Sequence, residues 1–72
     1  MQTNKSFANR VGIHYTYASR LRSGDRLPSA EVLVRIIREF DLPTELALDA
    51  FTAGPQQFSR FLNENVFDRE VA

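Results

Sequence analysis

Apolar residues recur every three or four positions along most of this 72-residue chain. That spacing places them on one face of an α-helix, and no segment alternates apolar and polar residues over more than a few positions, as a half-buried strand would. The pattern therefore predicts an all-α protein, a compact bundle of about five helices. We expect the helices to cover residues 3 or 4 to 11, 15–23, 30–40, 43–53 and 55–67.

Capping and helix-ending residues set these boundaries. Serine, threonine and asparagine accept hydrogen bonds from free N–H groups at a helix start, glycine ends helices in the left-handed conformation, and proline is favoured in a first turn. Residues 68–72 are expected to fray. The expected caps are Thr3 or Asn4 and Ser29, the helix-ending residues are Gly12, Gly24 and Gly54, and Pro43 and Pro55 open the last two helices.

Each predicted helix has a stripe of apolar residues that should face a common core. The last helix could use its stripe in either of two ways, to complete the core of one chain or to form a dimer interface, and we favour the interface. The inward positions are Phe7, Ala8, Val11, Ile13, Ala18, Leu21, Val32, Leu33, Ile36, Ile37, Phe40, Leu46, Ala47, Ala50 and Val66, and the dimerisation candidates are Phe51, Phe58, Phe61 and Leu62.

Charge is divided between the two halves of the chain, although the net charge is zero. Residues 1–38 hold seven basic and two acidic side chains, a net charge of +5, whereas residues 39–72 hold two basic and seven acidic ones, a net charge of −5. A basic half suits a polyanion, and an acidic half elsewhere would limit nonspecific binding and orient the approach. The alternative is two solvated faces of opposite charge.

The sequence offers no set of residues for catalysis or metal binding. It has no cysteine and one histidine, too few for a thiolate or zinc site. The carboxylates stand singly, without a neighbouring base or nucleophile, and there is no glycine-rich phosphate loop. No run approaches the roughly 18 apolar residues of a membrane span. We therefore expect a single cytoplasmic domain over residues 1–72 with no enzymatic activity, cofactor, metal, small-molecule ligand or membrane contact.

Residues 7–29 carry the spacing of two helices joined by a tight turn. Ala8 stands where the helices would cross, and Gly12 stands where the chain must turn with a positive φ. The second helix then buries Ala18 and Leu21 and turns a polar face outward, as a helix that enters the DNA major groove does. In this stretch, in loop 21–29 and in the helix that follows, the chain resembles the lambda-repressor-like helix-turn-helix family, the Cro and repressor type. The resemblance covers residues 3–52.

The resemblance implies which side chains contact DNA. The family pattern places His14 at the cap of the recognition helix, about residues 15–23, and Arg20 where it can donate two parallel hydrogen bonds to guanine. Basic side chains around this helix are candidates for phosphate contacts, which set the register. The expected base contacts are Tyr15, Thr16, Ser19 and Arg20, and the expected phosphate contacts are Lys5, Arg10, Tyr17, Arg22 and Arg26.

The chain departs from the family pattern at two places. The family usually has another helix before the motif, and only six residues precede Phe7 here, so the extra C-terminal helix 55–67 could replace the missing packing surface. Ala18 stands where the family has a larger aliphatic residue, so Tyr15 or Tyr17 would lean inward to fill the space. One tyrosine would then be lost from the DNA-reading face.

These observations predict a sequence-specific regulator that binds double-stranded DNA. By resemblance, the chain would act as a Cro-like repressor, for example of a phage, that covers a promoter as a homodimer on a pseudo-palindromic operator. One alternative keeps the DNA-binding half and makes the C-terminal half a docking surface for a protein, as in an antitoxin or a recombination accessory protein. Another is a helical protein-interaction module that does not touch DNA.

Overall fold

A computed structural model describes residues 2–68, and within that range the chain forms five α-helices, a closing π-helical turn and no strand. This confirms the predicted all-α class and the order of the elements. Each boundary lies within one residue of the prediction, except at the end of the last helix. The elements are α1 (Asn4–Val11), α2 (Tyr15–Ser23), α3 (Ala30–Phe40), α4 (Thr44–Ala53), α5 (Pro55–Leu62) and the π-helical turn (Asn63–Phe67).

The helix ends show why these segments are helical. The Thr3 hydroxyl accepts a hydrogen bond from the Ser6 N–H at 3.0 Å, so Thr3 rather than Asn4 caps α1, and Ser29 caps α3 in the same way. Gly12 and Gly24 end α1 and α2 with φ of 81° and 88°, a conformation that costs glycine little. The predicted caps and the left-handed turns at Gly12 and Gly24 are therefore confirmed, whereas Gly54 ends α4 with φ of 118° and ψ of 172°, outside the left-handed helical region. Residues 69–72, where fraying is expected, lie outside the described residues.

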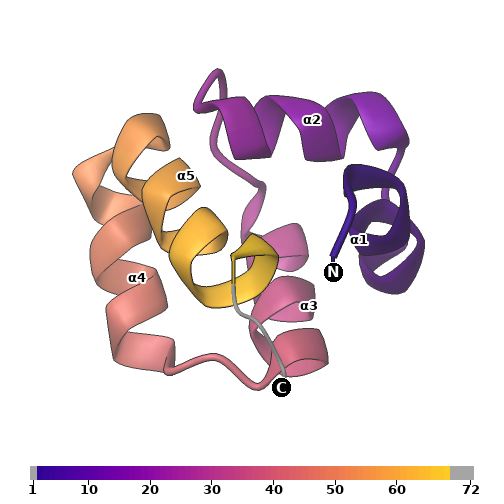
Figure 1. Cartoon of the computed structure of the whole chain (residues 1–72). Helices are drawn as coiled ribbons and strands as arrows, with labels where there is room; N and C mark the ends of the chain where they lie inside the picture. Colours follow the sequence, from indigo (N-terminus) through magenta and orange to yellow (C-terminus); the bar gives the residue numbers. More distant parts are fainter. Residues whose placement is uncertain (1, 69–72) are drawn as a thin grey trace.

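The last α-helix occupies the middle of the bundle (Figure 1). It packs against α2 on one side and α4 on the other, while α1 packs against both α2 and α3. The chain thus brings its C-terminal segment back against the first two helices. Helix α5 thus supplies the packing surface that was expected of helix 55–67.

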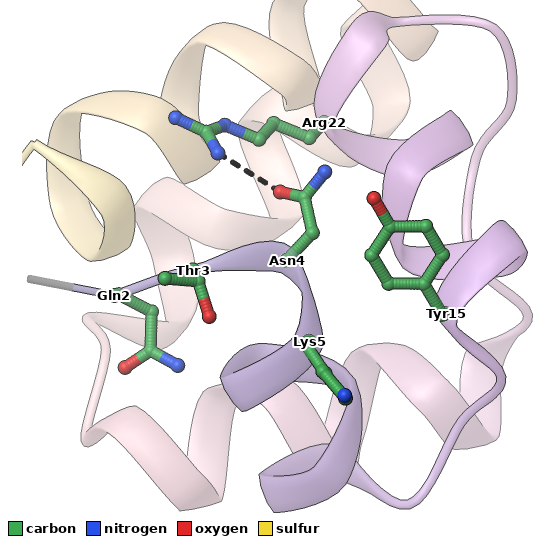
Figure 2. Close-up of a pocket in the computed structure, with 6 residues that line it drawn as sticks. All are labelled: Gln2, Thr3, Asn4, Lys5, Tyr15 and Arg22. Atoms are coloured by element: carbon green, nitrogen blue, oxygen red, sulfur yellow. Dashed lines mark hydrogen bonds between the residues drawn. The ribbon is translucent and has the colours of Figure 1, made fainter.

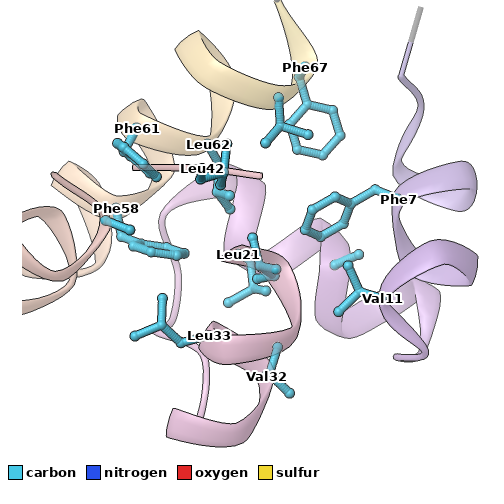
Figure 3. Close-up of a cluster of buried hydrophobic side chains, with 14 of the residues drawn as sticks. Phe7, Val11, Leu21, Val32, Leu33, Leu42, Phe58, Phe61, Leu62 and Phe67 are labelled. Carbon is cyan, nitrogen blue, oxygen red and sulfur yellow. The ribbon is translucent and has the colours of Figure 1, made fainter. Parts of the chain in front are cut away.

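One cluster of apolar side chains joins all the helices (Figure 3). Phe7 lies at one end of it, with its ring centroid 5.5 Å from that of Phe40 and 5.1 Å from that of Phe67. Phe58 meets Phe51 edge-on and Phe61 at a tilt, with centroids 6.3 and 6.1 Å away. Such aromatic pairs add to the stabilisation from burial alone.

Burial corrects the assignment of the dimerisation candidates. Phe58 and Leu62 have no exposed surface, Phe61 is 9% exposed, and Phe51 is half-buried against the same core. Side chains enclosed in this way are not available to a second chain. Of the two uses open to this stripe, the expected dimer interface is wrong, because Phe58, Phe61 and Leu62 complete the core of one chain.

Leu46 is a second correction. It is 57% exposed, although the pattern placed it in the core. The face of α4 that meets the core is centred on Ala47, which is fully buried, and consecutive residues of an α-helix point about 100° apart. Leu46 therefore lies at the flank of the buried stripe.

The C-terminal helix changes character before its expected end. After Leu62 the backbone widens into a π-helical turn, closed by a hydrogen bond of 2.7 Å from the Asp68 N–H to the Asn63 carbonyl. The wider turn lets two consecutive residues, Val66 and Phe67, enter the core together. The sequence pattern identified Val66 but not Phe67.

Candidate nucleic-acid interface

Helix α2 has one face in the core and the other in solvent. Ala18 and Leu21 are fully buried, whereas Tyr15, Thr16 and Arg20 are exposed and Ser19 is half-buried on the opposite side. The four predicted base-contacting residues therefore share a single face of α2. Within residues 2–68, the Arg20 guanidinium forms no hydrogen bond or ion pair, so its donors point into solvent.

The first turn of α2 is closed by His14. Its Nδ1 accepts a hydrogen bond of 3.1 Å from the Thr16 N–H, and its backbone is extended, as at a helix N-cap. The expected role of His14 as a cap is confirmed.

Tyr17 leans towards the body of the protein, whereas Tyr15 is 53% exposed. The Tyr17 hydroxyl accepts a hydrogen bond of 2.9 Å from the Ser29 N–H, and the Arg26 guanidinium lies over the Tyr17 ring, 4.6 Å from its centroid. Tyr17 is therefore the tyrosine that leans inward and packs against the core. It connects α2 to the start of α3 and places Arg26 beside α2.

A hollow of 540 Å³ lies between the start of α1 and the start of α2 (Figure 2). Lys5 is exposed at its rim, and the Tyr15 ring borders it from α2. A helix N-terminus with a nearby lysine favours anions such as phosphate. The other lining residues are Gln2, Thr3, Asn4 and Arg22.

Two predicted phosphate contacts are engaged within the protein. Arg10 forms an ion pair with Glu39 at 3.5 Å, and its guanidinium lies over the Phe40 ring, 4.3 Å from the centroid. Arg22, the other expected phosphate contact, does not face outward: it is half-buried and donates hydrogen bonds to Asn4 and Asn63. Its direction is set by partners 18 and 41 residues away, which no local pattern reveals.

Exposed acidic and basic side chains lie partly on different elements. Glu45 and Asp49 are exposed on α4, a helix that packs against α5. Lys5, Arg20 and Arg26 are exposed on α1, on α2 and on the loop that follows α2. Asp25 is also exposed directly after α2, so the separation of charge in space is partial.

A comparison with protein families finds a match between residues 3–46 and the model described as "Helix-turn-helix". The matched range begins at the cap of α1 and includes α2 and α3. No curated protein and no solved structure matches the chain. Among the helices described, all are too short or too polar to cross a membrane.

Proposed function

The chain belongs to the helix-turn-helix family of the lambda-repressor and Cro type, and from this premise we propose that it reads double-stranded DNA with α2 and regulates transcription as a repressor. The observation that carries the proposal is the exposed polar face of α2. That helix is fixed by its buried face and by caps at both ends, and it presents Tyr15, Thr16 and Arg20 to solvent.

The side chains on this face have the chemistry of direct readout. Arg20 can donate two parallel hydrogen bonds to guanine N7 and O6, a pairing that other bases do not offer. Thr16 offers a hydroxyl and a methyl group to neighbouring base edges, and Ser19 offers a hydroxyl. Tyr15, at the first turn of α2, can contact a thymine methyl group or the sugar-phosphate backbone. These four residues would supply the sequence preference.

Phosphate contacts on either side of α2 would fix its register in the groove. Lys5 at the start of α1 and Arg26 after α2 are exposed and lie near the two ends of the reading helix. Tyr17 could reach a phosphate through its hydroxyl proton, because the oxygen uses a lone pair for the Ser29 N–H. Arg10 would contribute only at the edge of the site, since its guanidinium already contacts Glu39 and Phe40.

The test is selection of bound duplexes from a random pool at about 0.1 M salt, where charges are screened over roughly 10 Å. We expect the wild-type protein to enrich one short motif. Arg20→Ala should cost about 1–3 kcal/mol on that motif and relax the preference at a single base pair. Arg26→Ala is the matched control, since losing a phosphate contact should weaken all duplexes alike.

Absence of any enriched motif for the wild type would contradict the proposal. Equal losses for Arg20→Ala and Arg26→Ala on every duplex would leave DNA binding intact but remove Arg20 from base recognition.

We further propose that two copies bind a pseudo-palindromic operator, with half-sites about one helical turn, roughly 34 Å, apart. The exposed large apolar side chains outside α2 are Val34 on α3 and Leu46 and Leu48 on α4. A groove of 260 Å³ between these helices is lined by Val34, Ile37, Arg38 and Thr44. Apolar centres flanked by both signs of charge, Arg38 on α3 and Glu45 on α4, suit contact with a second identical surface.

Val34→Glu tests this surface because it adds charge where the side chain lines the groove and is already 43% exposed, so the fold is retained. We expect the variant to bind a single half-site as the wild type does and to lose cooperative binding to the full operator, measured by gel shift. Unchanged cooperativity would exclude this surface from pairing and leave it for another partner, as in the antitoxin alternative.

A further inference from the structure

Arg22 lies at the junction of three elements that are distant in the sequence. Its Nη1 donates a hydrogen bond of 2.9 Å to Asn4 Oδ1 at the start of α1, which Figure 2 shows as a dashed line. Its Nε donates one of 3.2 Å to Asn63 Oδ1 in the π-helical turn. Its guanidinium carbon lies 4.2 Å from the centroid of the Phe67 ring.

The backbone of Arg22 is held by the same C-terminal segment. The carbonyl group of Arg22 lies in the last turn of α2, where carbonyls have no partner inside the helix. The Ser59 hydroxyl of α5 donates a hydrogen bond to it. Ser59 is buried, and in the part of the chain that the structure describes no buried side-chain polar atom lacks a partner. Hydrogen bonds thus hold both the main chain and the side chain of Arg22.

We propose that Arg22 is a positioning residue, which clamps α2 to the start of α1 and to the π-helical turn and so sets where the base-reading face lies relative to Lys5. The inference rests on the proposed DNA-reading function and adds to it a residue that fixes the position of the reading helix. Hydrogen bonds from a charged donor are stronger than neutral ones, and a cation over an aromatic ring adds attraction. Arg22 therefore acts as this clamp and not as a phosphate contact.

Positioning and phosphate contact predict opposite results for Asn63. Asn63→Ala removes a partner of Arg22 without changing any charge. If Arg22 positions α2, this variant should lose about tenfold in affinity for the selected duplex. If Arg22 instead contacts a phosphate, freeing it from Asn63 should leave the affinity unchanged or raise it.

The experiment measures affinity against salt concentration for the wild type, Arg22→Ala, Asn63→Ala and the double variant on the selected duplex. We expect similar losses for the two single variants, the same slope of log K against log salt for both, and a double variant no weaker than Arg22→Ala. Arg60→Ala is the control for loss of one exposed positive charge on α5. A slope that falls by about 0.9 per phosphate in Arg22→Ala alone would overturn the proposal.

Asn63→Asp keeps the experiment decisive if the alanine variants fold poorly. A carboxylate would hold the Arg22 guanidinium more strongly, so positioning predicts affinity within about twofold of the control Gln57→Glu, which adds the same charge at an exposed site. A much larger loss would indicate that Arg22 had been withdrawn from DNA and would overturn the proposal. Failure of the wild type to select any duplex would instead overturn the DNA-reading function itself.

Discussion

At the level of single residues, the reading helix depends on one nitrogen atom at its start. The His14 Nδ1 takes the hydrogen bond of the Thr16 N–H, and Thr16 and Tyr15 are both expected to contact DNA. The cap therefore fixes the backbone of the turn that carries these side chains. Histidine is an unusual N-cap, since serine, threonine, aspartate and asparagine are favoured there.

His14→Ala should lower the free energy of unfolding by about 0.5–2 kcal/mol, because the Thr16 N–H loses its partner. His14→Ser should retain most of the stability, since the hydroxyl can accept the same hydrogen bond. Urea denaturation of both variants, followed by circular dichroism, checks this. Equal destabilisation by alanine and serine would mean that the imidazole contributes packing rather than a cap.

The helix caps could be predicted from the sequence, whereas hydrogen bonds between residues distant in the sequence could not. Thr3, His14 and Ser29 cap helices whose first residues follow them directly, so short-range pattern is sufficient. The inward turn of Arg22 depends on Asn4 and Asn63, whose approach requires the whole fold. Residues at the surface of α2 were placed correctly on one face because helical periodicity alone determines it, but their contacts with DNA stay predictions.

At the level of the elements, α3 ends in a conformation that few residues tolerate. Asp41 has φ of 50° and ψ of 51°, the left-handed region, and it is the one non-glycine residue with positive φ in the range the structure describes. Asparagine and aspartate adopt this conformation more readily than other L-residues. The negative charge of Asp41, however, lies at the end of the helix where the dipole disfavours it.

Asp41→Asn should therefore raise the free energy of unfolding by about 0.3–1 kcal/mol at low salt, with a smaller gain at high salt. Asp41→Ala is the informative companion, because it also removes the charge but lacks the side chain that tolerates the left-handed conformation. Its free energy of unfolding should be lower than that of the wild type by about 1 kcal/mol. Thermal unfolding at two salt concentrations measures both, and equal stability of the two variants would contradict the argument.

The C-terminal helix shows where periodicity fails at this level. The apolar spacing of Phe58, Phe61 and Leu62 predicted the helix and its buried face correctly. The same spacing fits a core and a dimer interface equally well, so burial within one chain had to come from the structure. The π-helical turn was not predicted for a related reason, since regular helical spacing does not place the consecutive residues Val66 and Phe67 in the core together.

At the level of the whole molecule, the two halves of opposite charge affect how the protein meets DNA. The exposed carboxylates of α4 would repel a polyanion that approaches from the wrong side, while the basic residues around α2 attract it. Such repulsion acts on all DNA sequences and is screened by salt. The repulsion should therefore increase the preference for the specific DNA site mainly by weakening nonspecific binding.

Neutralising this charge with Glu45→Gln and Asp49→Asn should raise affinity for a scrambled duplex by roughly severalfold at 50 mM salt and have little effect at 200 mM. A duplex too short for two copies keeps pairing between proteins out of the measurement. Fluorescence anisotropy gives both affinities. A gain that is equal at the two salt concentrations, or confined to the selected duplex, would contradict a long-range electrostatic origin.

The contact between Phe7 and Phe67 has a consequence for the order in which the protein is made. The two rings lie 5.1 Å apart between centroids, yet one belongs to the first helix and the other to the last turn described. At synthesis rates of about 5–20 residues per second, α1 and α2 leave the ribosome seconds before Phe67 can cover them. A nascent chain would thus carry the complete reading helix without its support, and α2 would be held for DNA binding only once residue 67 has been made.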